Sequence, residues 1–126
     1  MWMFSKIGFF SAVAAMKNNK TDPSRVVVRA RSVDHLKALK KEFPAIGKMK
    51  IETEGRHPSG FPRDYPARIV MPKDVWSDIV GVLAEEIDYT NFKNSIDEDK
   101  YHDAMMRVWS VMRDYQDGVN GIERKF

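Results

Sequence analysis

Apolar runs separated by polar clusters predict strands at the start of the chain. Residues 7–14 form an apolar run of the length of a buried strand, and Trp2 and Phe4 extend this apolar character upstream. Residues 17–24 (KNNKTDPS) predict a turn, because Asn, Asp, Pro and Ser favour turns. Residues 25–31 then alternate between two faces, with Val26, Val28 and Ala30 on one and the arginines and Val27 on the other. We expect the two strands to form a hairpin.

A helix and two further structural segments follow. Ser32 is placed as an N-cap, and residues 33–43 carry apolar side chains at intervals of three and four, which is typical of one helix face. Pro44 predicts the end of this helix. Residues 49–53 alternate like a half-buried strand, and residues 55–66 are rich in Gly and Pro, which predicts a loop.

The second half of the chain is predicted to be mainly helical. Residues 67–71 resemble another strand, and a helix is expected from about Pro72 to Ile87. Residues 88–95 contain Asp, Asn, Thr and Ser, which favour helix caps, so we expect a break between two helices there. Residues 97–116 carry apolar positions at alternating spacings of four and three, which predicts a long helix that stops near Gly118.

The order of these elements predicts an α+β fold. Each half is ββα, so we expect a four-stranded sheet of order 1-2-4-3, a permuted ferredoxin-like ββαββα arrangement. Two helices would pack on the sheet, and the last helix would follow. A chain of 126 residues fits a single domain over residues 1–118, with a loosely ordered tail at 119–126.

Composition narrows the class of protein. With 43% hydrophobic and 31% charged residues the chain is not wholly disordered, and without Cys it has no disulfide framework and no Cys-ligated metal site. Residues 1–16 resemble a signal peptide, but Trp2 and Phe4 precede Lys6 where a basic segment belongs. No apolar run approaches the ~20 residues of a membrane-spanning helix. We therefore expect a cytoplasmic protein with no membrane partner.

Charge is divided along the sequence. Residues 1–73 carry fifteen Lys and Arg against six Asp and Glu, a net +9, while residues 74–126 carry six against twelve, a net −6. A basic surface attracts phosphates or acidic proteins. The alternative is that the two halves neutralise one another or simply solvate the fold.

The histidines give little support for catalysis. His35 lies beside the apolar stripe of its helix, where a structural role is expected. His57 lies in the loop with Arg63, but no Ser-His-Asp order or glycine elbow accompanies it, so a hydrolase remains a distant alternative. There is no phosphate-binding loop or EF-hand pattern. We predict that the protein is not an enzyme and needs no cofactor or small-molecule substrate.

Acidic groups offer two other candidate sites. Glu98, Asp99 and His102 lie about one helical turn apart and could hold a metal, although a solvated helix surface explains them better. Residues 85–88 include carboxylates that could serve in hydrolysis, but they fall at a helix end rather than in a cleft. We predict no metal site.

Basic residues of the strands form the best candidate for ligand binding. Arginines of residues 25–31 share one strand face, and a phosphate backbone would suit them. Arginine on an open sheet face also serves solubility alone. The candidate binding residues are Arg25, Arg29, Arg31, Lys37, Lys40, Lys41, Lys50, Arg56, His57, Arg63, Arg68 and Trp109.

The last predicted helix suggests a protein contact. Met105, Met106, Trp109 and Met112 occupy more than one stripe of this helix, and Met and aromatic residues are enriched at adaptable interfaces. Such residues also fill cores. We expect a protein partner or self-association here.

Several segments resemble a family of small uncharacterised bacterial proteins. The resemblance spans most of the chain and rests on MWMF, GFFS, VRAR, PKDVW, DYTNFK and VWSVM. It implies a shared fold and carries over no catalytic residue. The loop at residues 55–66 looks longer here than in that family, so a role specific to this lineage could lie there.

Together these features predict a non-enzymatic binding or regulatory protein that acts through a protein–protein contact. The size of the chain is also typical of phage or mobile-element accessory and anti-defence proteins, by analogy alone. The alternative is a nucleic-acid-binding module that uses a basic sheet face.

Overall fold

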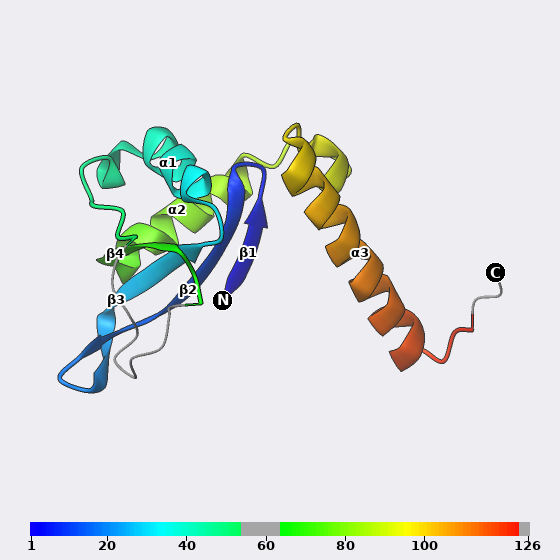
Figure 1. The fold of residues 1–126 in the computed structure, drawn as a ribbon, viewed down its shortest axis with the longest axis horizontal. Helices are drawn as coiled ribbons and strands as arrows, with labels where there is room; N and C mark the ends of the chain where they lie inside the picture. Colours follow the sequence, from blue (N-terminus) through cyan, green and yellow to red (C-terminus); the bar gives the residue numbers. More distant parts are fainter. Residues whose placement is uncertain (54–63, 124–126) are drawn as a thin grey trace. The chain divides into compact units, whose positions relative to one another are not determined.

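The computed structural model describes residues 1–53 and 64–123 and divides the chain into two compact units (Figure 1). Unit 1 is Met1–Ile87 and unit 2 is Asp88–Phe126. The assignment of residues 1–118 to one domain, with a tail from 119, stays a prediction.

Unit 1 is built on an antiparallel sheet. Within the described residues its strands are β1 (Trp2–Ser5), β2 (Gly8–Lys17), β3 (Lys20–Ala30) and β4 (Ala67–Pro72). They lie in the order β1-β2-β3-β4, and each neighbouring pair is antiparallel. The predicted α+β class with a four-stranded sheet is confirmed.

The predicted strand order 1-2-4-3 is wrong, and so is the permuted ferredoxin-like arrangement that depended on it. The first apolar run and its upstream extension form two strands rather than one, because the chain turns at Lys6 and Ile7 and pairs Trp2 with Ser11 and Ser5 with Gly8. Residues 49–53 are not a strand. Only Glu52 forms a bridge with Arg68, through backbone bonds of 2.8 and 3.0 Å, so this segment adds one contact at the β4 edge.

The β2–β3 hairpin is longer than predicted, because the tight turn is confined to Asn18 and Asn19. Both have positive φ, 52° and 62°, a conformation that Asn tolerates and that suits a two-residue hairpin. The register shifts after Ala14, where β3 has extra residues. Asp22 closes this bulge by accepting hydrogen bonds from the Ser24 amide and hydroxyl at 2.9 and 2.6 Å, and from Arg25 Nε at 2.8 Å.

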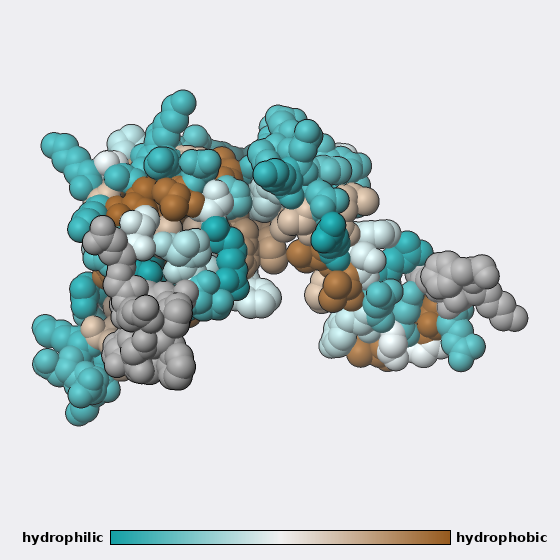
Figure 2. Space-filling model, viewed as in Figure 1, coloured by the Kyte–Doolittle hydropathy of each residue, from teal (hydrophilic) through white to brown (hydrophobic). Residues whose placement is uncertain are grey.

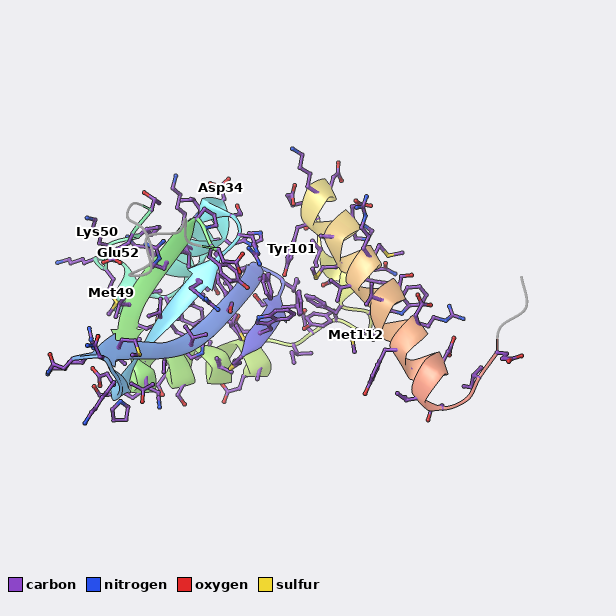
Figure 3. All side chains as sticks on the ribbon, turned by 60° about the horizontal axis from the view of Figure 1, so that its bottom comes forward. Asp34, Met49, Lys50, Glu52, Tyr101 and Met112 are labelled. Atoms are coloured by element: carbon purple, nitrogen blue, oxygen red, sulfur yellow. The ribbon has the colours of Figure 1, made fainter. Side chains whose placement is uncertain are left out.

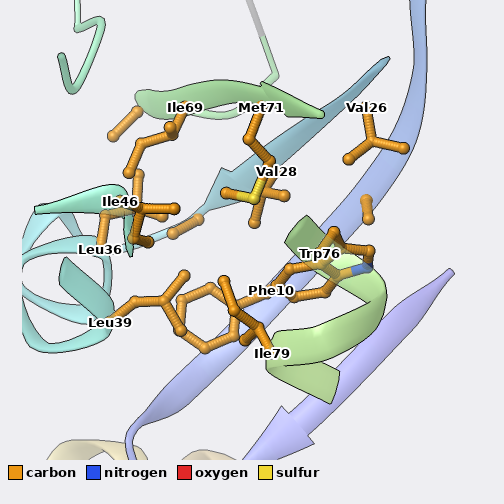
Figure 4. Packing of buried hydrophobic residues seen from close by; sticks show 13 residues of the cluster. Phe10, Val26, Val28, Leu36, Leu39, Ile46, Ile69, Met71, Trp76 and Ile79 are labelled. Atoms are coloured by element: carbon orange, nitrogen blue, oxygen red, sulfur yellow. The ribbon is translucent and has the colours of Figure 1, made fainter. Parts of the chain in front are cut away.

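Two helices cover one face of the sheet. They are α1 (Val33–Glu42) and α2 (Lys73–Glu85), and the short 3-10 helix η1 (Pro44–Ile46) follows α1. Alternate residues of β2, β3 and β4 point toward these helices. The buried cluster consists of Phe10, Ala12, Val26, Val28, Ala30, Leu36, Leu39, Ile46, Ala67, Ile69, Met71, Trp76 and Ile79 (Figure 4). Each large side chain buried there contributes about 1.5–3 kcal/mol.

Unit 2 consists mainly of a long helix. The 3-10 helix η2 (Lys93–Ser95) precedes α3 (Asp99–Val119), which extends beyond the predicted stop at Gly118. Glu98 caps α3, because its carboxylate accepts hydrogen bonds from the amides of Lys100 and Tyr101. A carboxylate at this position is also favoured by the helix macrodipole.

Candidate functional site

The sheet face opposite α1 and α2 carries polar and aromatic side chains. Val26, Val28 and Ala30 face the helices, so the alternate residues of β3 face the other way. The pairing register sets Trp2 opposite Ser11, Ser11 opposite Arg29, and Arg29 opposite Arg68. We call this surface the sheet-face patch, and it consists of Trp2, Phe4, Phe9, Ser11, Arg29, Arg31, Asp64, Tyr65 and Arg68.

Tyr65 organises the cationic part of the patch. The guanidinium carbons of Arg29 and Arg31 lie 4.4 and 3.9 Å from its ring centroid, which is cation–π geometry. Arg29 also donates from Nη2 to Ser11 Oγ at 2.7 Å. Its buried Nε has no hydrogen-bond acceptor among the described residues. These contacts hold both guanidiniums in fixed positions.

Asp64 is the acidic member of the patch. Arg31 Nη1 donates to Asp64 Oδ1 at 3.0 Å and to the Asp64 backbone oxygen at 2.9 Å, and the two side chains are 51% and 73% exposed. The hydrogen bond from Arg31 lowers the pKa of Asp64, and the same bond raises the pKa of Arg31. Asp64 is therefore ionised at neutral pH. Because the pair is solvated, it contributes little to stability.

Aromatic side chains form the other part of the patch. The Phe4 and Phe9 rings are stacked with centroids 4.6 Å apart, and Trp2 meets Phe9 edge-on at 5.9 Å. Trp2 is 69% exposed, whereas a Trp side chain is on average largely buried. The patch thus offers a solvent-facing indole backed by two phenyl rings.

The structure brings together some of the predicted binding residues and separates others. Arg29, Arg31 and Arg68 share the sheet-face patch, with Arg68 buried opposite Arg29. Arg25 is occupied by Asp22 at 2.8 Å. Three others, Lys37, Lys40 and Lys41, lie on α1, which packs on the opposite sheet face. Lys50 is exposed outside the strands, and Trp109 belongs to unit 2. The last three, Arg56, His57 and Arg63, lie outside the described residues.

Tyr65, Asp64 and Ser11 were not predicted as site residues. Tyr65 and Asp64 are more than thirty positions from their arginine partners, and no local pattern connects them. Ser11 carried a usable signal, because a polar residue inside the apolar run 7–14 marks a strand position that leaves the core.

A second candidate surface lies on α3. Tyr101, Met105, Val108, Met112, Tyr115 and Val119 recur at alternating spacings of four and three, and we call them the α3 stripe. Tyr101 and Met105 are buried, whereas Met112, Tyr115 and Val119 are 54%, 63% and 62% exposed. Figure 3 shows Tyr101 and Met112 on the same side of the helix. The second half of the stripe is therefore open to solvent.

Trp109 extends this apolar surface sideways. It is 45% exposed, and the charged ends of Lys93 and Arg113 lie 5.4 and 5.2 Å from its ring. A hollow of about 590 Å³ is lined by Trp109, Met112, Arg113, Tyr115, Gln116, Val119 and Asn120. Brown, hydrophobic surface is visible along this helix in Figure 2.

The remaining candidate groups have structural positions. His35 Nδ1 accepts a hydrogen bond from the Phe9 amide at 3.2 Å, and its ring lies beside Gly8. Glu98 is occupied as the helix cap. In the part of the chain that is described, residues 1–53 and 64–123, no three His, Asp or Glu side chains gather as metal ligands would. His57, the candidate loop histidine, lies outside this part.

None of the helices described for residues 1–53 and 64–123 combines the length and the apolar character that a membrane span requires.

Comparison with known proteins adds no relative: no family model matches the chain, and neither a curated protein nor a solved structure is detectably similar to it. The resemblance to a bacterial family stays a prediction.

Proposed function

We propose that the protein is a non-enzymatic binding protein that acts through a protein–protein contact made by the α3 stripe. The observation that carries this proposal is the exposure of Met112, Tyr115 and Val119. They continue the same helix stripe in which Tyr101 and Met105 are buried. A regulatory role and a cytoplasmic location, which the sequence led us to expect, belong to the same proposal.

The partner that fits the stripe best is a second copy of the same helix. Alternating spacings of four and three form the seam along which two helices pack in a coiled coil. The positions beside the exposed half of the seam are Trp109, Val111, Gln116 and Gly118, and none carries a charge. The cationic ends of Lys93 and Arg113 lie over Trp109 at the edge of the seam, so they have to extend into solvent when two copies meet.

The exposed area sets the expected strength of this contact. Complete burial of a Met, Tyr or Val side chain is worth about 1.5–3 kcal/mol, and roughly half of that remains to be gained where the side chain is half exposed. Six such side chains in a symmetric pair give about 5–9 kcal/mol, to which Trp109 and Val111 add. Association itself costs about 4–15 kcal/mol. The gain and the cost are of similar size, so the proposed dimer is expected to be weak and to dissociate on dilution.

Light scattering after size-exclusion chromatography tests the proposal over a dilution series. We expect the wild-type mass to fall from dimer to monomer on dilution, and Met112→Glu to be monomeric throughout because it places a charge in the seam. Ser110→Glu is the matched control, since it adds the same charge to an exposed position on the other side of α3 and should leave the dimer intact. A wild-type protein that stays monomeric at its solubility limit would overturn the proposal.

A further inference from the structure

We infer that the sheet-face patch binds single-stranded nucleic acid, with a base stacked on Trp2 and a phosphate held by Arg31. This inference uses unit 1 alone and is independent of the α3 stripe. It joins two observations on one sheet face, namely an exposed aromatic platform and fixed guanidinium groups.

The aromatic part suits a nucleobase. Trp2 is 69% exposed and is braced edge-on by Phe9, which in turn stacks on Phe4 at 4.6 Å. A braced indole loses little conformational freedom when a base stacks on it. Proteins that bind single strands use such aromatic side chains because every base offers a flat π-face, whereas bases inside a duplex are already stacked on one another.

The cationic part suits a phosphate. Arg31 is about half exposed, and its guanidinium is fixed by the Tyr65 ring at 3.9 Å and by Asp64 at 3.0 Å. A planar guanidinium with several donors binds phosphate oxygens in pairs. The Asp64 carboxylate occupies part of the position that a phosphate would take, so it is expected to compete with the ligand.

The register places these two parts within reach of one short single-stranded oligonucleotide. Trp2 lies opposite Ser11, and Ser11 lies opposite Arg29, so the backbones of Trp2 and Arg29 are two strand spacings apart, about 10 Å. Arg31 comes two residues after Arg29, about 7 Å further along the chain. Unit 1 as a whole carries fifteen Lys and Arg against ten Asp and Glu, a net charge of +5, which favours a polyanion.

An acidic protein would satisfy the arginines but not the indole. A carboxylate-rich peptide presents charge without flat apolar rings, so it leaves Trp2 and its phenyl supports exposed. The combination therefore favours nucleic acid over an acidic peptide, and the experiment compares the two directly.

Fluorescence anisotropy with a labelled single-stranded DNA of mixed sequence tests the inference at several salt concentrations. We expect binding that weakens with salt, and Trp2→Ala to weaken it by about 5-fold to 150-fold through the lost stacking. Arg31→Ala should lower the salt slope by about one phosphate contact. The matched control Lys37→Ala/Lys41→Ala removes two exposed charges from α1, which covers the opposite face, and should change affinity much less than Trp2→Ala does.

Competitors decide between ligand classes. Unlabelled single-stranded DNA should displace the probe at lower concentration than the duplex of the same sequence or poly-glutamate does. Equal displacement by poly-glutamate would replace the inference with an acidic-protein contact. Absence of binding at low salt, or an affinity that Trp2→Ala leaves unchanged while its circular dichroism stays native, would overturn it.

Discussion

Gly8 begins β2 directly against the ring of His35, and this contact yields a quantitative test of the fold. A Cβ added at Gly8 would lie 2.5 Å from His35 Cγ and 2.6 Å from His35 Cβ. Carbon atoms do not approach so closely, so either the helix side chain or the strand has to move. His35 also accepts the Phe9 amide hydrogen bond at 3.2 Å, and movement of its ring disturbs that bond.

The expected cost of Gly8→Ala follows from these two contacts. Overpacking of a closely packed site costs about 1–3 kcal/mol, and the disturbed hydrogen bond adds about 1 kcal/mol. The free energy of unfolding should therefore fall by about 2–4 kcal/mol, a large part of the ~5–15 kcal/mol typical of a domain. Urea denaturation followed by circular dichroism measures this difference.

Gly81→Ala is the matched control in the same unit. Gly81 lies inside α2, and a Cβ added there meets no atom within 4 Å, so the same substitution should stabilise the protein by about 0.5–1 kcal/mol. In a His35→Gly background Gly8→Ala should cost less, because both clashing atoms, Cβ and Cγ, are gone, while the positive φ of 157° at Gly8 still disfavours a side chain there. A Gly8→Ala variant as stable as the wild type, or an undiminished cost in that background, would refute the reasoning.

Three further outcomes can be measured. Phe10→Ala should lower the free energy of unfolding by about 3–5 kcal/mol in urea denaturation, because its side chain is 0% exposed, whereas Phe9→Ala on the other face should cost less. Hydrogen bonds from Ser24 and Arg25 lower the pKa of Asp22, so the Ser24 amide should titrate in an NMR pH series with a midpoint below 3.8. The ionised Asp22 stabilises the fold above pH 3.8, and this contribution is lost as the pH falls through the lowered pKa. An unshifted midpoint would contradict this reasoning. Asp64→Asn should strengthen oligonucleotide binding in the anisotropy assay by freeing Arg31, and weaker binding with unchanged stability would argue against competition.

Side-chain alternation predicted which face of β3 is buried, because Val26, Val28 and Ala30 cannot leave the core without exposing three apolar side chains. Helix periodicity located α1, α2 and α3, because apolar side chains at intervals of three and four mark the helix face that packs. The boundary between β1 and β2 was missed, since the central turn residues Lys6 and Ile7 carry no turn signal, although Ser5 and Gly8 occupy the outer positions at which turns favour Ser and Gly.

The strand order failed at residues 49–53, where local pattern and long-range pairing disagree. The alternation of MKIET is typical of a strand, but only Glu52 reaches the backbone of β4. A strand needs a partner along its length, and a sequence pattern does not reveal whether the edge of the sheet offers one. The hairpin turn, by contrast, was predicted, but over residues 17–24, whereas the structure confines it to Asn18 and Asn19, both with positive φ.

The candidate site shows the same division between local and long-range information. Strand parity alone assigns Arg29 and Arg31 to the face opposite Val28, so their common orientation was predictable. What fixes them is Tyr65, which follows a long connection and reaches both guanidiniums because β4 pairs beside β3. Without this ring Ser11 would still hold Arg29 and Asp64 would still hold Arg31, but the two guanidiniums would lose the ring that both of them contact. Their close placement therefore depends on the tertiary fold, and replacing Tyr65 by Leu should separate them while leaving the strand pairing intact.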